Sequence, residues 1–87
     1  MGNIVVKLRK VIDSADGPID ELTLREPEFG DMIRMKSGLN EAQMTAEIIS
    51  ACSGVAQVFL AKLSLADVAR IQRKLAPFLS PEEDEED

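Results

Sequence analysis

Apolar and polar positions alternate in the first third of the chain. From Ile4 to Ile12, and again from Ile19 to about Glu26, most alternate positions are apolar. This period of two is typical of strands with one buried face. The intervening residues 13–18 favour turns, and Gly17 can take the positive φ of a tight reversal. The pattern predicts an antiparallel hairpin over residues 4–26. Its inner face is Val6, Leu8, Leu22 and Leu24.

A period of three to four residues replaces the alternation after Pro27. Proline has no N–H for a strand ladder, but its fixed φ suits the first turn of a helix. Phe29, Met32 and Ile33 then recur at helical spacing. The rest of the chain predicts four short helices, over residues of about 27–37, 40–53, 55–62 and 64–78.

Local signals mark where these helices begin and end. Gly38 can supply the left-handed residue after the first helix. Asn40 with Gln43, and Ser64 with Asp67, have the spacing of a capping box. Asp67 and Arg70 then face solvent together. Pro77 is expected to end or kink the last helix.

These elements predict an α+β fold. Two strands alone are marginally stable in water, so the hairpin must pack on a small bundle of three to four short helices. The chain has 87 residues, which is enough for a single small core. We expect one domain over residues 1–79.

The acidity of the chain is concentrated at one end. The formal net charge is −6, and residues 82–87 are six consecutive acids. The other residues carry ten basic and ten acidic groups. A run of like charges without apolar residues cannot bury enough surface to offset its ordering entropy. We therefore expect residues 80–87 to be an acidic disordered tail.

Composition also narrows the class of protein. A neutral body with three aromatic residues argues against nucleic-acid binding, and small basic clusters at 7–10 and 70–74 fit solvated faces. No apolar run is long enough to span a membrane and no secretory signal is evident. The single cysteine, Cys52, fits a buried thiol in a reducing compartment. We expect a soluble cytosolic protein.

The usual chemistry of enzymes is missing from the sequence. It has no histidine, tyrosine or tryptophan, which removes the commonest general base and zinc ligand. Glu26, Glu28 and Asp31 fall close together, but acids at a helix start are explained by the helix dipole. We therefore expect no catalysis, no cofactor and no metal.

One pair of charged residues stands at the predicted corner between strand and helix. The guanidinium of Arg25, at the end of the strand, can reach the carboxylate of Asp31 in the first helical turn and fix the corner, which Pro27 and Gly30 also shape. The alternative places Arg25 on the exposed hairpin face as a partner contact.

The segment 19–32 resembles the opening signature of the phage tail assembly chaperone family, in its Mu-like, E-type form from contractile-tailed phages and prophages. The signature has Leu-Thr-Leu-Arg-Glu-Pro, two variable residues, Gly-Asp and an apolar residue. Here it is matched by Leu22 to Pro27 and by Gly30-Asp31. The segments 51–54 and 63–67 and the pair Phe78-Leu79 are also similar to it. The acidic tail is not part of the pattern.

The resemblance implies a non-catalytic protein in the cytoplasm of the host bacterium. Such a chaperone holds the tape-measure protein while the tail tube polymerises, and is absent from the finished virion. A longer form made by ribosomal frameshifting would recruit tail-tube protein, and homo-oligomers are possible. For the partner-binding surface we expect an exposed part of the last two helices, namely Leu60, Val68, Ile71, Leu75 and Phe78. The alternative is that all five lie in the core.

Two other functions remain open. The acidic tail is compatible with a phage-encoded decoy or adaptor that binds a host protein, since a run of acids mimics nucleic-acid charge. A minor structural subunit of the tail is the third hypothesis.

Overall fold

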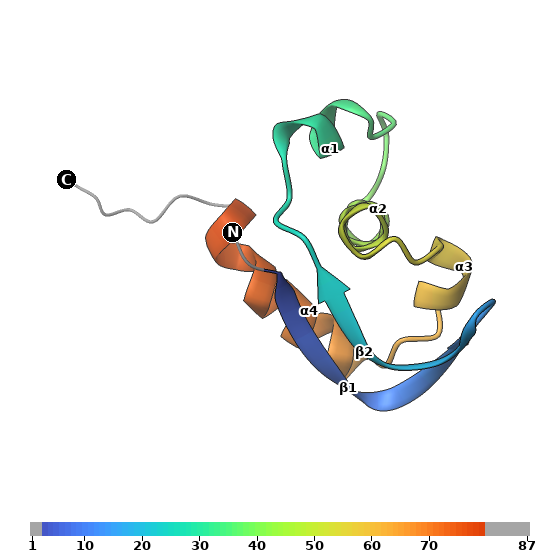
Figure 1. Cartoon of the computed structure of the whole chain (residues 1–87). Coiled ribbons are helices and arrows are strands. Elements are labelled where there is room, and N and C mark those ends of the chain that lie inside the picture. Colours follow the sequence, from blue (N-terminus) through green and yellow to red (C-terminus); the bar gives the residue numbers. More distant parts are fainter. Residues whose placement is uncertain (1–2, 80–87) are drawn as a thin grey trace.

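The computed structural model describes residues 3–79 as a hairpin covered on one face by helices (Figure 1). In chain order, the elements are β1 (Ile4–Ser14), β2 (Gly17–Leu24), α1 (Phe29–Ile33), α2 (Glu41–Ser53), α3 (Gln57–Leu60) and α4 (Leu65–Leu79). The predicted α+β architecture is confirmed. The predicted disorder of 80–87 lies outside the described residues, and the division into one domain and a tail stays a prediction.

The two strands pair antiparallel around a turn of two residues. Ser14 pairs with Gly17, and Gly17 has φ +116°, a conformation open to glycine because it has no Cβ. The Ser14 hydroxyl donates to the Gly17 carbonyl at 2.7 Å. β1 therefore ends at Ser14 and β2 begins at Gly17, whereas the sequence predicted strands that end at Ile12 and begin at Ile19.

β1 carries a large bulge in its middle. Lys7 pairs with Glu21 and Ile12 pairs with Ile19, so residues 8–11 of β1 lie opposite Asp20 alone. Such a bulge removes backbone N–H and C=O groups from the ladder. Other partners must satisfy those groups.

The core lies between the hairpin and the helices. α4 packs on β1, α2 packs on β2, and α3 contacts both α2 and β1. The elements contribute a single buried apolar cluster, made of Val6, Leu8, Ile12, Leu22, Leu24, Ile48, Ile49, Cys52, Leu60, Ile71 and Leu75. α1 gives no apolar side chain to this cluster and stands apart from the sheet in Figure 1.

Three predicted boundaries are wrong. β2 ends at Leu24 instead of Glu26, because the N–H of Arg25 donates to the Cys52 carbonyl of α2 at 3.0 Å. α1 spans only Phe29–Ile33, with Glu28 as its N-cap, so Pro27 precedes the helix. α3 likewise shrinks to one turn.

Pro77 does not end α4, which continues to Leu79. A proline near the C-terminus of a helix removes one backbone hydrogen bond, and only two residues follow it here. α4 thus keeps its last turn.

The predicted capping box of α2 is confirmed. Gln43 N–H donates to the Asn40 side chain at 2.8 Å, and Asn40 N–H donates to Gln43 Oε1 at 2.9 Å. At the start of α4 only half of the predicted box is present: Asp67 N–H donates to the Ser64 hydroxyl at 3.1 Å. The carboxylate of Asp67 has other partners. Among the described helices, none is both long and apolar enough to cross a membrane.

Candidate functional site

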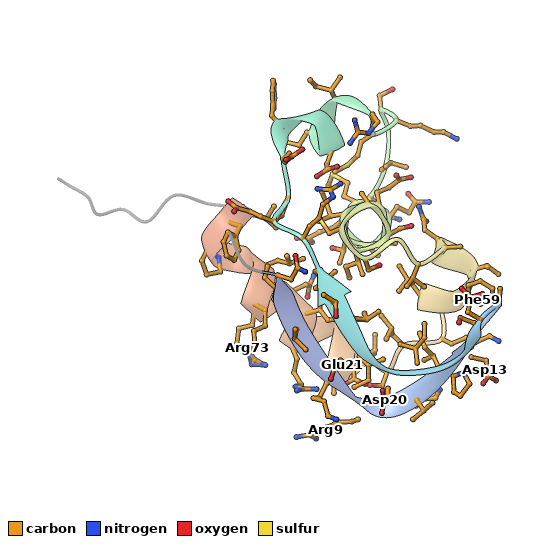
Figure 2. All side chains as sticks on the ribbon, viewed as in Figure 1. Arg9, Asp13, Asp20, Glu21, Phe59 and Arg73 are labelled. Carbon is orange, nitrogen blue, oxygen red and sulfur yellow. The ribbon has the colours of Figure 1, made fainter. Side chains whose placement is uncertain are left out.

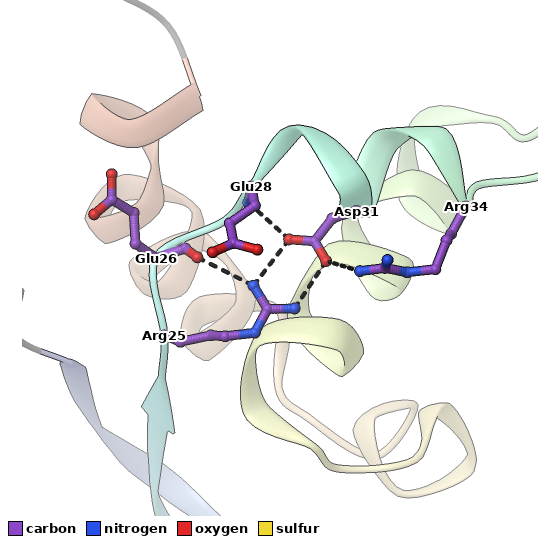
Figure 3. Close-up of polar contacts among 5 residues, drawn as sticks. All are labelled: Arg25, Glu26, Glu28, Asp31 and Arg34. Atoms are coloured by element: carbon purple, nitrogen blue, oxygen red, sulfur yellow. Dashed lines mark hydrogen bonds and ion pairs between the residues drawn. The ribbon is translucent and has the colours of Figure 1, made fainter.

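Asp31 is the buried centre of the corner between β2 and α1 (Figure 3). Its carboxylate accepts two hydrogen bonds from Arg25, at 2.8 and 3.0 Å, and one from Arg34 at 2.9 Å. The backbone N–H of Glu28 adds a fourth at 2.8 Å. Arg25 also donates to the Glu26 carbonyl at 3.1 Å. The Arg25–Asp31 contact anticipated from the sequence is thus present, and Arg34 joins it.

This geometry keeps Asp31 ionised. The hydrogen bonds from Arg25 hold the pKa of Asp31 well below its usual range, although burial by itself would raise that pKa. The same contact raises the pKa of Arg25 above its ordinary value. Both carboxylate oxygens are occupied by donors, so Asp31 has little capacity left to act as a metal ligand. Within residues 3–79, no group of three His, Cys, Asp or Glu side chains is placed to hold a metal ion.

The helix that this network holds, α1, buries a charged residue and exposes its apolar residues. The only buried residue of α1 is Asp31. Its apolar residues point outward, with Phe29 74% exposed, Met32 63% and Ile33 68%. Three large apolar side chains are thus exposed together on one short helix, and clustered apolar exposure is a feature of interaction sites. We call these three residues the α1 patch.

No direct signal for the exposure of the α1 patch is present in the sequence. Helical spacing of Phe29, Met32 and Ile33 is the usual mark of a face that packs inward. The pairing of Arg25 with Asp31 was the available clue, because a helix anchored to the body through a carboxylate must turn that face inward. The apolar residues of the helix then face solvent.

The five residues predicted for partner binding fall into two groups. Leu60, Ile71 and Leu75 are buried in the core, so the exposure that the prediction required of them is absent. Val68 is half-buried and Phe78 is 45% exposed, so the alternative that all five lie in the core is wrong as well. In α3, Leu60 faces the core and Val58 is the exposed apolar residue.

Two open hollows lie on either side of the place where α2 and α4 meet. One, of about 300 Å³, lies toward the end of α4 and includes Met44 and Leu79 in its lining. The other, of about 360 Å³, lies toward α3 and includes Leu65 and Val68. A hydrogen bond from Gln72 to Thr45 at 3.2 Å separates them. These apolar hollows are a second surface that another polypeptide can contact.

A second buried carboxylate, Asp67, holds the bulge of β1 against α4. It accepts hydrogen bonds from the backbone N–H groups of Arg9, at 3.0 Å, and Lys10, at 3.1 Å. Arg70 donates to Asp67 at 3.1 Å and also to the carbonyl of Lys7. The expectation that Asp67 faces solvent with Arg70 is therefore wrong, since Asp67 is fully buried. The hydrogen bonds that Asp67 accepts from the β1 backbone replace strand-to-strand hydrogen bonds that the bulge removes.

Burial by itself raises the pKa of the Asp67 carboxyl, but the hydrogen bonds from Arg9, Lys10 and Arg70 outweigh it. The pKa lies below its ordinary value as a result. Cys52 behaves in the opposite way, because burial raises the pKa of its thiol. The carboxylates of Asp31 and Asp67 and the guanidinium groups of Arg25 and Arg70 are committed to structural contacts. The site can therefore present apolar surface, and its charged groups serve to position it.

Comparison with known protein families finds a match over most of the chain. The chain matches the model of the family described as phage tail assembly chaperone proteins, E, or 41 or 14, over residues 5–80. Comparison with curated proteins finds no match, and comparison with solved structures finds none either. The match covers the hairpin from its second residue onward and all four helices, including the corner and the α1 patch. The chain therefore belongs to the family of phage tail assembly chaperone proteins.

Proposed function

We propose that this chaperone binds the tape-measure protein during tail assembly in the host cytoplasm, performs no catalysis, and is absent from the finished virion. The observation that carries the proposal is the α1 patch, in which Phe29, Met32 and Ile33 are each more than 60% exposed. Exposing such side chains on a small soluble protein favours aggregation, so their exposure is best explained by a partner that covers them. A long helical tape-measure protein offers amphipathic segments of matching chemistry.

The corner network supports this role by fixing where the patch points. α1 has only five residues, and an isolated helix of that length does not form in water. The bonds to Asp31 from Arg25, Arg34 and the Glu28 N–H hold it in place. We propose that Arg25, Pro27, Gly30 and Asp31 act as positioning residues, which keep the α1 patch ordered before the partner binds. Preorganisation of this kind reduces the entropy lost on binding.

The two hollows between α2 and α4 are the second contact surface of the proposal. Of the predicted partner-binding set, Phe78 is exposed, while half-buried Val68 and buried Leu60 and Leu75 form part of the lining of the hollows. Ile71 is fully buried, so it contributes to the proposed surface only by stabilising the core beneath it. A longer frameshifted form that recruits tail-tube protein, and self-association of copies along the tape-measure protein, extend the same proposal.

Co-expression tests the proposal directly. The wild-type chain, produced with the tape-measure protein of the same phage, should keep that protein soluble and be retained with it in a pull-down. The triple change Phe29→Ser, Met32→Ser and Ile33→Ser should abolish both effects without lowering stability, because these side chains are exposed. Val11→Ser with Val58→Ser is the matched control, since both residues are exposed apolar positions away from α1 and outside the lining of the two hollows.

Several results would contradict the proposal. A triple variant that still rescues solubility would remove the α1 patch from the site. Failure of the folded wild-type chain to rescue would remove the tape-measure protein as partner. Detection of the chain by mass spectrometry in purified virions would instead favour a structural tail subunit.

A further inference from the structure

Basic side chains gather where β1 lies against α4. Arg9 of β1 and Arg70, Arg73 and Lys74 of α4 line an open hollow together with two alanines of α4. Figure 2 shows Arg9 and Arg73 projecting outward on this side of the molecule. We call these four basic residues the cationic face. Lys7 and Lys10, both exposed on β1, extend it.

Few acids oppose this charge. Asp67 lies beneath the face, but it is buried and already bonded to Arg70 and the backbone of β1. Glu21 pairs across the hairpin with Lys7, at the edge of the face, and Asp20 is the next residue along β2. Within residues 3–79, Arg9, Arg73 and Lys74 form no ion pair. The face therefore has an excess of positive charge on a body that is neutral in sum.

We propose that the acidic segment 82–87 of the same chain docks on the cationic face. The segment supplies six consecutive carboxylates to a surface with excess positive charge, so the two are complementary. It contains no apolar residue, so it does not suit the apolar hollows between α2 and α4. The cationic face is the surface of this chain that matches its chemistry.

The connection between the two is short enough for contact within one molecule. From Leu79 back to Ala66, at the far end of the hollow, the distance along α4 is about 20 Å at 1.5 Å per residue. Residues 80–87 span up to about 26–29 Å when extended. A segment that reverses direction after Leu79 therefore reaches Lys74, Arg73 and Arg70 in turn. A short tether also holds the acids at an effective concentration of about millimolar, which compensates for the weakness of exposed ion pairs.

The acidic segment would compete with other polyanions for the cationic face. While residues 82–87 occupy it, nucleic acid in the host cytoplasm meets a surface whose charge is already neutralised. This role is independent of tape-measure binding, which uses apolar surface on other elements. The two can therefore fail separately.

Amide and arginine side-chain NMR spectra of three chains test the proposal. The first is the full chain, the second ends at Pro81, and the third carries Glu82→Gln, Glu83→Gln, Asp84→Asn, Glu85→Gln, Glu86→Gln and Asp87→Asn. At about 0.02 M salt, both altered chains should differ from the full chain at Arg9, Arg70, Arg73 and Lys74. These differences should largely vanish at about 0.5 M salt, where the Debye length falls to a few ångströms. The folded body should be unchanged, since only residues beyond α4 are altered.

Changes on the other side of the contact complete the test. In the full chain, the double change Arg73→Glu and Lys74→Glu should release the acidic segment. The NMR signals of residues 82–87 should then have the chemical shifts that they have at high salt. Lys36→Glu with Lys62→Glu is the matched control, because both lysines are exposed and neither lines the hollow; it should leave those signals unchanged. Spectra of the cationic face that do not respond to truncation would overturn the proposal. Differences that grow with protein concentration would also overturn it, since they would place the segment on a second copy.

Discussion

Both carboxylate oxygens of Asp67 lie 3.0 Å from the backbone nitrogen of Arg9, fifty-eight residues earlier in the chain. This contact joins the start of α4 to the bulge of β1, where the strand ladder is interrupted. A buried carboxylate therefore takes the place of the missing neighbouring strand. The fold depends on it because, within residues 3–79, the sheet consists of these two strands alone.

Replacement of Asp67 should destabilise the protein strongly. Asp67→Ala leaves the N–H groups of Arg9 and Lys10 without their acceptor and Arg70 without its ion pair. A change of this kind costs about 3–5 kcal/mol, because a buried charge network loses one member. The free energy of unfolding, measured with urea, checks it. Asp20→Asn, on the exposed face of β2, should stay within about 0.5 kcal/mol of wild type; a similar loss in both variants would contradict the assignment.

Stability should fall steeply in acid. The pKa values of Asp31 and Asp67 are both lowered in the folded state, while the unfolded value of Asp is about 3.9. The unfolded chain therefore binds more protons as the pH drops, so the stabilisation is complete above about pH 5 and is lost progressively below about pH 4. Urea unfolding at several values between about pH 6 and pH 2.5 measures the slope. Asp31→Asn should be less stable at neutral pH but should lose less on acidification, and an unchanged slope would count against the Asp31 contribution.

Hydrophobic periodicity was sufficient to predict the strands and helices and their order along the chain. Strict alternation identifies both strands, because Val6, Leu22 and Leu24 can reach the core only from one face of a hairpin. The Asn40–Gln43 capping box locates the start of α2 within one residue. These features depend on neighbours in sequence, which is why the sequence predicts them.

The candidate site depends instead on contacts between distant residues. Asp67 has the spacing of a cap residue with Ser64, and nothing local shows that its carboxylate will bind the backbone of Arg9. The orientation of α1 follows from Asp31 being drawn inward by Arg25, and that polar contact overrides the apolar spacing of Phe29 and Met32. Hydrophobic periodicity carries no information about either of these polar contacts.

The two arginines around Asp31 should differ in their contribution. Arg25 makes a bidentate contact and also binds the Glu26 carbonyl, whereas Arg34 makes one bond from a more exposed side chain. Arg25→Ala should therefore destabilise the protein more than Arg34→Ala, which should cost at most about 1 kcal/mol. Thermal unfolding of both variants measures the difference. Arg25→Lys separates geometry from charge, since lysine cannot form the two parallel bonds; full stability of this variant would show that charge alone is enough.

The thiol of Cys52 should react slowly in the folded protein. Its side chain is buried in α2, and burial raises the pKa of the thiol, so little thiolate is present at neutral pH. Labelling with a disulfide reagent should be much slower than for the urea-unfolded chain. The rate should rise in Arg25→Ala, because that change removes the side-chain bonds to Asp31 that hold the corner, and the corner is joined to α2 by the backbone hydrogen bond from residue 25 to the Cys52 carbonyl. Rapid labelling of the native wild-type chain would contradict the burial of this residue.

Two glycines should respond differently to the same added methyl group. Gly54 ends α2 with φ +77°, and a Cβ there would meet nothing within 4 Å, so Gly54→Ala should cost about 1–2 kcal/mol through backbone conformation alone. Gly30 has no positive φ, and its Cβ would lie 3.3 Å from a guanidinium nitrogen of Arg34. That side chain is 68% exposed and can move, so Gly30→Ala should stay within about 0.5 kcal/mol, helped by the helix propensity of alanine. Urea midpoints of the two variants measure the contrast. A larger loss at Gly30 would show that the Arg34–Asp31 bond contributes more to the corner than its exposure indicates.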